Sequence, residues 1–543
     1  IDATEYVPIA DTITNIPLIK FDSIDGMFAS DNLILTGLSS EFSARFEVAA
    51  NAMMLIIDGT STSNTDSYKI DYTLNVQLTA NGYTPDIVGN RDVIIDASKA
   101  GLLIDGSNYS DVIGTIPILD WRGRDFNTHV RFYPRIGRFD PKRIELINFD
   151  KQSGLWFELQ YADDFIQLKI KSLTDYSEYS NGDRYVNADV YPDEPDPSRF
   201  PDFSWDFIPR WTNARKNKQY KSDELKILAN NNAVVKVASL AGHPTLEEGT
   251  IATAIELRKK SNNEDFKIFC YWNSFVYWGT YRASATFGGH SWLRKKNGEL
   301  ENIGTEDLPR YVYNHAVPAM REWWIKTAVD LVSEVDSDGN PVFDGIFIDK
   351  TADPRDAMTD DHRQMITELA ERLPSSKIYI GNALRQMSKN GARDRLSYMD
   401  GSYMENWTQG PSQEMSEKVT ASIQLAREAL SKGKMLWLTS GPWGCGWPCD
   451  VTEEEFLSSM DMPLAIFLMI AETNAYFNYQ KETLVQEDAW KWDSSTMPEF
   501  KKALGAPKGP PIKVGNTLSR HFEYLTVQVD LDAEQAILNW HAE

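Results

Sequence analysis

Two carboxylates in this chain end apolar, strand-like runs and could share one reaction. Asp349 ends FDGIFID (residues 343–349), and Glu405 ends YMDGSYME (residues 398–405). A carboxylate at the end of an apolar strand needs a partner or a chemical role, because burying it unpaired costs several kcal/mol. Two such groups can cleave a glycosidic bond when one attacks the anomeric carbon and the other protonates the leaving oxygen. The structural alternatives for Asp349 are a turn cap or an ion pair with Lys350.

The role of Glu405 has alternatives within the same region. Side chains alternate along a strand, so Glu405 lies on one face of its run and could point into a site. Asp400 shares neither its parity nor its terminal position, and we expect a structural role early in the strand. If Glu405 and the residues after it only position substrate, the acid role is open to Asp353 or Asp450, which lie in polar loops.

Residues suited to sugar binding follow several predicted strands. Aromatic rings stack on pyranose faces, and amides reach pairs of hydroxyl groups. Each of these residues alone could equally serve core packing or brace a loop, but together they favour a glycan site: Trp211, Asn273, Asn382, Trp407, Trp443 and Tyr479. Three cations, Arg282, Lys350 and Arg385, could bind anionic substituents such as sulfate, or could simply form salt bridges, and His290 could contact substrate.

The elements that position these residues form a repeating pattern after residue 196. Strand-like runs alternate with amphipathic helical stretches, which indicates βα units on a parallel sheet. Eight such strands predict a TIM barrel, in which catalytic groups lie where strands end. The predicted strands are residues 203–208, 233–238, 267–272, 345–349, 377–381, 398–405, 435–439 and 475–478, and the predicted helices are residues 222–230, 250–260, 316–335, 360–373, 412–432 and 453–470.

The first 195 residues show a different pattern of predicted secondary structure. Short strands separated by turns predict a β-sandwich of the jelly-roll kind, with its clearest hairpin at residues 156–170. A Pro- and acid-rich segment, YPDEPDPSRFP (residues 191–201), marks the boundary to a barrel over 196–500, and residues 501–543 are expected to form a short β tail packed on the barrel. The oxygen-rich loop at residues 58–66 could hold a structural calcium, although such a stretch is more often a solvated loop.

Two resemblances to known families add to this interpretation. The run IELINFDKQSGLWFELQYADDFIQLKIK resembles laminin-G/concanavalin-like sandwiches, which implies carbohydrate binding or a purely structural accessory domain. DGIFIDK and YMENW, preceded by GHSWLRKKNGEL and NHAVPAMREWW, resemble TIM-barrel glycoside hydrolases of the alpha-galactosidase and dextranase type, and the interval between the two carboxylates also resembles the endo-alpha-fucanase family. The resemblance implies that Asp349 is the nucleophile and Glu405 the acid/base.

Composition excludes several other classes of protein. The chain has 543 residues, with 55 Lys and Arg against 79 Asp and Glu, and the net charge of −24 repels nucleic acid. The longest apolar run, residues 463–471, is too short to span a membrane. The seven histidines show no metal-binding spacing, and no phosphate-binding glycine motif or serine-hydrolase elbow is present, so we expect no cofactor.

The sequence also carries weak signs of location and redox state. It begins with Ile and has no leader-like segment, which is compatible with a processed, secreted, periplasmic or cell-surface protein. Cys445 and Cys449 could form a small disulfide or remain loop thiols, and Cys270 is expected to be a buried free thiol.

The predicted function is hydrolysis of an α-linked polysaccharide or oligosaccharide, sulfated or not, in endo mode and with retention. The alternatives are a non-catalytic carbohydrate-binding protein on a degenerate barrel and a polysaccharide lyase.

Overall fold

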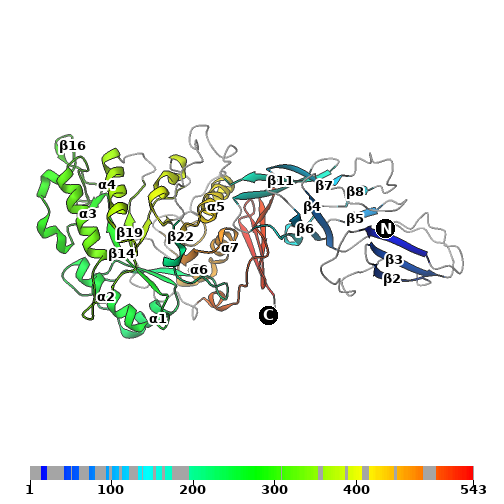
Figure 1. The fold of residues 1–543 in the computed structure, drawn as a ribbon, viewed down its shortest axis with the longest axis horizontal. Helices are drawn as coiled ribbons and strands as arrows, with labels where there is room; N and C mark the ends of the chain where they lie inside the picture. Colours follow the sequence, from blue (N-terminus) through cyan, green and yellow to red (C-terminus); the bar gives the residue numbers. More distant parts are fainter. Residues whose placement is uncertain are drawn as a thin grey trace. The chain divides into compact units, whose positions relative to one another are not determined.

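The computed structural model describes two compact units. It describes strands at 14–20, 42–49, 52–59, 73–79 and 93–96, and then residues 101–108, 113–120, 132–136, 138–150, 154–161, 165–173, 195–306, 309–352, 359–385, 389–405, 415–445, 449, 451–480 and 497–541. One unit comprises residues 1–172 and 507–533, and the other comprises residues 173–506 and 534–543 (Figure 1). The predicted tail over 501–543 is therefore divided between the units.

The first unit contains only strands and short 3-10 turns among its described residues. The hairpin predicted at residues 156–170 is present as the antiparallel pair β10–β11, and β24 joins β10 in parallel. Leu102, Ile104, Phe157 and Leu168 are among the apolar residues of its core. The strands are β1 (Thr14–Lys20), β2 (Phe42–Ala49), β3 (Ala52–Gly59), β4 (Thr73–Thr79), β5 (Val93–Asp96), β6 (Gly101–Asn108), β7 (Gly114–Asp120), β8 (Phe132–Ile136), β9 (Ile144–Ile147), β10 (Leu155–Tyr161), β11 (Phe165–Ser172), β24 (Ile512–Val514), β25 (Thr517–His521) and β26 (Leu525–Asp530).

The arrangement of these strands into a sandwich stays a prediction. Most side chains before residue 138 lie outside the described residues, and so does the rest of the candidate calcium loop after Gly59.

The second unit is built on eight parallel strands that close into a barrel. Each strand pairs with the next along the chain, and a parallel bridge between Arg210 and Phe477 joins the last strand to the start of the first. This confirms the predicted barrel (Figure 1). Its strands are β12 (Trp211–Ala214), β13 (Val234–Val237), β14 (Lys267–Asn273), β19 (Gly345–Asp349), β20 (Ile378–Gly381), β21 (Gly401–Glu405), β22 (Met435–Ser440) and β23 (Ala475–Tyr479).

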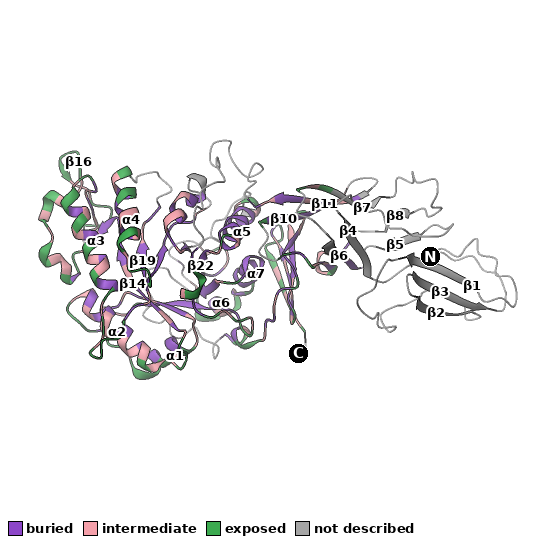
Figure 2. Cartoon of the chain, in the orientation of Figure 1, coloured by how far each residue is buried: buried purple, intermediate pink, exposed green. Residues whose placement is uncertain are grey.

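Helices lie between most of these strands, with short insertions after β14. Figure 2 shows that the barrel strands are largely buried, whereas α2, α3 and α4 present exposed faces, as amphipathic helices around a barrel should. The helices are α1 (Ser222–Asn230), α2 (Leu246–Lys260), α3 (Pro318–Val332), α4 (Asp360–Arg372), α5 (Met415–Ser431), α6 (Glu453–Ser458) and α7 (Asp461–Ile470), and the short strands are β15 (Val276–Tyr277) with β18 (Tyr311–Val312) and β16 (Lys295–Lys296) with β17 (Glu299–Leu300). The last strand, β27 (Gln535–Trp540), packs against α7.

The local sequence explains where these helices begin. Thr245 and Thr359 cap α2 and α4 by accepting backbone N–H bonds, and acidic residues occupy the first turn of each. The helix predicted over 453–470 is two helices, α6 and α7. Pro463 lies in the first turn of α7, where proline is tolerated, so its position marks a new start rather than a continuation.

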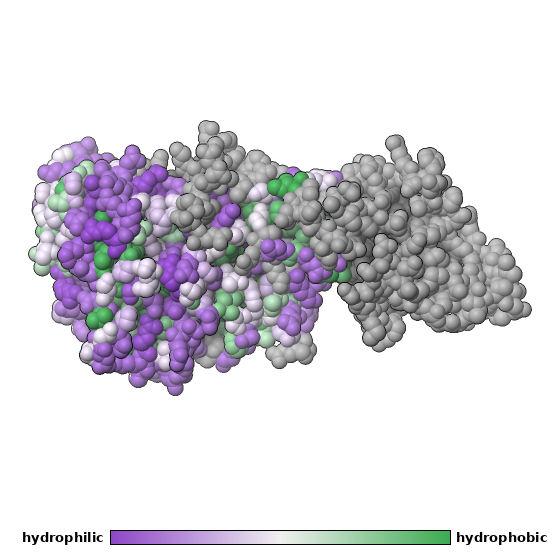
Figure 3. Space-filling view, viewed as in Figure 1, coloured by the Kyte–Doolittle hydropathy of each residue, from purple (hydrophilic) through white to green (hydrophobic). Residues whose placement is uncertain are grey.

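The first barrel strand lies later in the chain than the sequence predicts. Residues 203–208 are not a strand, and β12 begins at Trp211, after Pro209. In this segment Phe203 is partly buried and packs against the barrel core. The face of this unit seen in Figure 3 is largely hydrophilic, with only small hydrophobic areas.

The inward-facing side chains of the barrel form layers. Phe269, Phe347 and Trp437 belong to one buried core cluster in the barrel. Because side chains alternate along a strand, Asp349 lies on the same face of β19 as Phe347, two residues nearer the carboxyl end. Glu405 lies in the same way on the same face of β21 as Tyr403, two residues nearer the carboxyl end. The carboxyl ends of the strands therefore carry the polar layer above an aromatic one.

Candidate active site

Asp349 is held by four hydrogen-bond donors. Its Oδ2 accepts bonds from the Tyr271 hydroxyl at 2.8 Å and from Asn273 Nδ2 at 3.1 Å. Its Oδ1 accepts bonds from Asn382 Nδ2 at 2.9 Å and from the backbone N–H of Lys350 at 2.8 Å. Burial alone would raise the pKa of Asp349, but the Lys350 charge, the Asn382 amide, Lys236 and Tyr271 outweigh it and lower the pKa below its ordinary value. Asp349 is therefore ionised at neutral pH.

The backbone around Asp349 is anchored from behind. Ser274 donates its N–H to the Asp349 carbonyl at 3.1 Å, and its hydroxyl lies 2.8 Å from that carbonyl and 3.0 Å from the Lys350 carbonyl. Lys350 has a φ of 60°, a left-handed conformation that a non-glycine residue adopts only where its surroundings hold it. These contacts fix the direction in which the carboxylate points.

Two buried histidines support Ser274. His362 Nε2 lies 3.0 Å from the Ser274 hydroxyl, and His315 Nε2 lies 2.8 Å from the Ser274 carbonyl. Burial lowers the pKa of His315 to about 4 and lowers the pKa of His362 well below its ordinary value, so both rings are neutral at pH 7. No spacing pattern predicts this support, because the two histidines come from different segments of the chain.

Glu405 shares one hydrogen-bond donor, Asn382, with Asp349. Its Oε2 accepts bonds from Arg385 Nη2 at 2.9 Å and from Asn382 Nδ2 at 3.3 Å, and its side chain is 26% exposed. Arg385 Nη2 also donates to Asn382 Oδ1 at 2.9 Å, which fixes the orientation of the amide. Asn382 Nδ2 therefore donates to both carboxylates.

This shared donor limits the separation of the two carboxylates. Bonds of 2.9 and 3.3 Å from one nitrogen leave the Asp349 Oδ1 and Glu405 Oε2 atoms no more than about 6.2 Å apart. The two N–H bonds of an amide diverge by about 120°, and well-aligned acceptors at these distances lie about 5.4 Å apart.

Lys236, on β13, lies beneath this pair. Its Nζ is 4.1 Å from the centre of the Phe347 ring and within 6 Å of three further rings, those of Tyr403, Tyr271 and Trp211, at 5.4, 5.6 and 5.8 Å. Burial lowers the pKa of Lys236 to about 8, although Asp349 and Glu405 act in the opposite direction. Lys236 was not among the predicted site residues, and the one sign of it in the sequence is a charge in the middle of the apolar strand VVKV.

Amides from the first and last strands line another part of the same end of the barrel. Asn213 Nδ2 and Asn478 Nδ2 both donate to Gln480 Oε1, at 3.3 and 2.8 Å. Gln480 Nε2 has no hydrogen-bond partner among the described residues. Such amides suit hydroxyl groups. None of the three was predicted: the first strand was expected too early to include Asn213, and no motif marks Asn478 or Gln480 at the end of the last strand.

Two of the predicted binding residues, Asn273 and Asn382, donate hydrogen bonds to Asp349. Lys350 is the next residue in the chain after Asp349. Trp211 does not follow the first strand but lies within it. It is fully buried, stacks on Trp437 at 5.1 Å and donates Nε1 to the Leu438 carbonyl. Tyr479 is also buried, and its hydroxyl donates to the Phe456 carbonyl at 2.7 Å. Neither ring presents a face to a sugar, and we leave both out of the proposed site.

The other predicted residues are engaged in ion pairs or hydrogen bonds, are exposed in a turn, or lie outside the described residues. Arg282 forms an exposed ion pair with Glu334, and Arg385 pairs with Glu405, so neither is a ready anion-binding group. His290 is exposed in a 3-10 turn after β15, and Trp443 donates Nε1 to Glu534 at 2.9 Å. Trp407, Asp353 and Asp450 lie outside the described residues.

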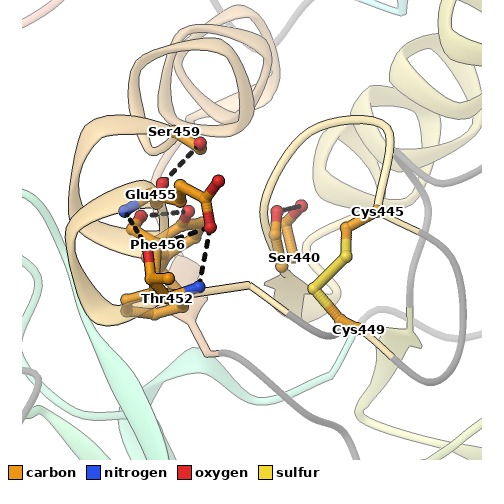
Figure 4. The surroundings of a disulfide bond; sticks show 9 residues. Ser440, Cys445, Cys449, Thr452, Glu455, Phe456 and Ser459 are labelled. Carbon is orange, nitrogen blue, oxygen red and sulfur yellow. Dashed lines mark hydrogen bonds between the residues drawn. A yellow bond between two sulfur atoms is a disulfide. The ribbon is translucent and has the colours of Figure 1, made fainter.

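The loop after β22 contains a disulfide. Cys445 and Cys449 are bonded, with Cα atoms 5.4 Å apart, and Cys270 is a buried free thiol. Figure 4 shows the disulfide, Ser440 at the end of β22 and the first turn of α6, where Thr452 and Glu455 form a capping box.

The described residues show two further absences. Within the ranges given above, no three His, Cys, Asp or Glu side chains gather in a way that could hold a metal ion. Among the helices of these same ranges, none combines the length and the apolar character that a membrane span requires.

Comparisons with known proteins relate the chain to glycan-degrading enzymes. Residues 260–526 match a family model described as hypothetical glycosyl hydrolase family 15, and this range contains Asp349, Asn382 and Glu405. No curated protein matches the sequence.

Several solved structures are similar at low identity. The alpha-galactosidase from Thermus thermophilus is 10% identical, with 70% of this chain and 75% of that chain covered and a TM-score of 0.34. The type III pullulan hydrolase from Thermococcus kodakarensis is 13% identical, with 69% and 88% covered and a TM-score of 0.39. The alpha-N-acetylgalactosaminidase from Bifidobacterium bifidum is 10% identical, with 69% and 65% covered and a TM-score of 0.37.

Proposed function

We propose that this protein is a glycoside hydrolase that cleaves an α-linked glycan within the chain, with retention of anomeric configuration. The observation that carries the proposal is the pair of carboxylates at the ends of β19 and β21, joined through Asn382 Nδ2. The family match over residues 260–526 supports the glycosidase part. The α-linkage and the endo mode rest on the resemblance of DGIFIDK and YMENW to known hydrolases.

Asp349 is the nucleophile in this proposal. Its four donors and lowered pKa keep it ionised, and a carboxylate must be ionised to attack carbon. In the first step an Asp349 oxygen bonds to the anomeric carbon, the glycosidic C–O bond breaks, and Glu405 gives its proton to the departing oxygen. The product is a glycosyl ester on Asp349 and a free alcohol.

Glu405 then reverses its role. As a carboxylate it takes a proton from water, the water oxygen attacks the anomeric carbon, and Asp349 leaves as the free carboxylate. Glu405 is partly exposed, so water can reach it, whereas Asp349 is enclosed by its donors. A separation of about 5–5.5 Å is typical of retaining pairs, and inverting pairs are about 6.5–9.5 Å apart. The geometry at Asn382 supports the shorter class.

The test is hydrolysis of a panel of α-linked glycans by the purified protein. The panel contains dextran, pullulan, polygalacturonate, fucoidan and α-galactosides, with products separated by size and the new reducing ends counted. Oligosaccharide release by the wild type and loss of at least about a thousandfold in Asp349→Asn and Glu405→Gln would support the proposal. Asp330→Asn, on the exposed face of α3, is the matched control.

Two results would contradict the proposal. Binding of a glycan without release of any product would favour a carbohydrate-binding protein. Release of products that absorb in the ultraviolet would indicate a lyase, because elimination creates a carbon–carbon double bond and hydrolysis does not.

A further inference from the structure

Among the described residues at the carboxyl ends of the barrel strands, positive charges outnumber negative ones. Arg215, Lys236 and Lys350 form no ion pair with any residue in the described ranges, whereas Glu405 is paired with Arg385. This surplus contrasts with the net charge of −24 for the whole chain. A locally positive region on an otherwise acidic protein attracts anions.

The donors of Lys236 are available to a ligand. Its ammonium has three N–H groups, and none of them is hydrogen-bonded to a described residue. Rings contributed by β12, β14, β19 and β21 surround it, but a ring face satisfies charge without accepting a directed hydrogen bond. The residue as a whole is half-buried, and its amino group is close enough to Asp349 and Glu405, at the carboxyl ends of the strands, for their charges to act on it.

The surroundings of Lys236 make an anionic partner favourable. A cation among rings has lost much of its hydration, and the pKa of Lys236 is lowered to about 8 by burial despite the nearby Asp349 and Glu405. Arg215 is exposed and lies directly after β12. Its charge lowers the pKa of Lys236, as burial does, so the two cations are close enough to repel each other. An anionic oxygen placed between them would relieve that repulsion and make charge-assisted hydrogen bonds.

We propose that Lys236 and Arg215 form an anion subsite that binds a carboxylate or sulfate group of the sugar held against Asp349. The inference rests on the proposed function, because it assigns the substrate class of the same site. Lys236 supplies a point charge from the floor, and Arg215 supplies a planar fork from the rim. Neither residue takes part in bond breaking, so both determine specificity.

Calorimetric binding to Asp349→Asn tests the inference without turnover. Three oligosaccharide probes of similar length are compared: neutral isomaltotetraose, tetragalacturonate with carboxylates, and a sulfated fucan tetrasaccharide. We expect at least one anionic probe to bind about tenfold or more tightly than the neutral probe at low salt, and this preference to shrink in 0.5 M NaCl. The two anionic probes distinguish a carboxylate from a sulfate as the group recognised.

Variants identify the residues responsible. In the Asp349→Asn background, Lys236→Met and Arg215→Ala should each remove most of the preference for the anionic probe, while the affinity for isomaltotetraose changes less than about threefold. Lys326→Met, whose side chain is 65% exposed on α3, is the matched control and should change neither affinity. Circular dichroism and melting temperature check that each variant is folded.

Several results would overturn the inference. They are equal affinity for the neutral and anionic probes, no binding of either anionic probe, and an anion preference that survives both Lys236→Met and Arg215→Ala. If any of these results is found and the wild type still hydrolyses a neutral glycan, the anion subsite is contradicted but the proposed hydrolase function is not.

Discussion

Asp349 and Glu405 share one hydrogen-bond donor, the amide nitrogen of Asn382. The nitrogen lies 2.9 Å from Asp349 Oδ1 and 3.3 Å from Glu405 Oε2, and Arg385 fixes the amide by donating to its oxygen. A single side chain directly after β20, the strand between β19 and β21, thus sets the distance and relative orientation of the two carboxylates. Asn382 is a positioning residue for both.

Replacing Asn382 should impair catalysis more than folding. Asn382→Ala removes an N–H from each carboxylate, and we expect kcat/KM to fall about a hundredfold, in the range found when one preorganised donor is lost. Asn340→Ala, in the exposed turn before β19, is the matched control and should keep wild-type activity. A folded Asn382→Ala variant with unchanged kcat/KM would show that the shared amide is not needed.

Tyr271 should set the acidic limb of the pH–rate profile. Tyr271→Phe removes the hydroxyl that donates to Asp349 Oδ2 but keeps the ring that stacks on Phe347. Losing a hydrogen bond to a carboxylate raises its pKa, so the acidic limb of kcat/KM should move to higher pH. Tyr281→Phe is the control, because the buried Tyr281 hydroxyl has no hydrogen-bond partner among the described residues, and its profile should match the wild type. Coincident profiles for all three proteins would exclude this role for Tyr271.

The protonation state of Lys236 should control how tightly an anionic substrate binds above pH 7. The groups that act on its charge are Asp349 on β19, Glu405 on β21 and Arg215 after β12, with the Tyr271 and Tyr403 rings beside it. Its pKa of about 8 predicts that KM for an anionic substrate rises as pH increases from 7 to 9, because the ammonium loses its proton. Lys236→Met should already have the high KM at pH 7 and show little further change. A KM that stays constant to pH 9 in the wild type would contradict this.

The buried histidines should make the protein less stable in mild acid. His315 takes up a proton near pH 6.5 when unfolded but only near pH 4 when folded, so acidification between these values favours unfolding. The lowered pKa corresponds to a loss of roughly 3 kcal/mol in the free energy of unfolding across this interval. Urea titrations at pH 7.0 and 5.0 should show about 2 kcal/mol of this loss. His315→Gln should weaken the pH dependence, His243→Gln at an exposed position should not, and identical pH dependence in both variants would refute the assignment.

The positions of Asp349 and Glu405 at strand ends could be predicted because local signals in the sequence mark them. β19 has the predicted bounds, since an apolar run between Asp344 and Lys350 leaves little freedom for its ends. Both carboxylates end their strands, and the carboxyl ends of parallel strands meet at one end of a barrel. These features depend only on residues close together in the chain.

The rest of the site depends on contacts that no local pattern encodes. Lys236 and Tyr271 face inward only because β13 and β14 have a particular register in the closed barrel, and in isolation each looks like a residue of an ordinary strand. Arg282 was predicted to bind anions, but it forms an ion pair with Glu334, which is far away in the sequence. Trp211 looked like a loop residue because the alternation of residues 203–208 imitated a strand.

The most direct test of the central claim is the anomeric configuration of the first product. Proton NMR during hydrolysis of the best glycan of the panel observes the new reducing end before mutarotation. If Asp349 attacks carbon and Glu405 serves as acid and then base, the product first appears as the α-anomer. First appearance of the β-anomer would contradict the account and would make Asp349 the base that activates water.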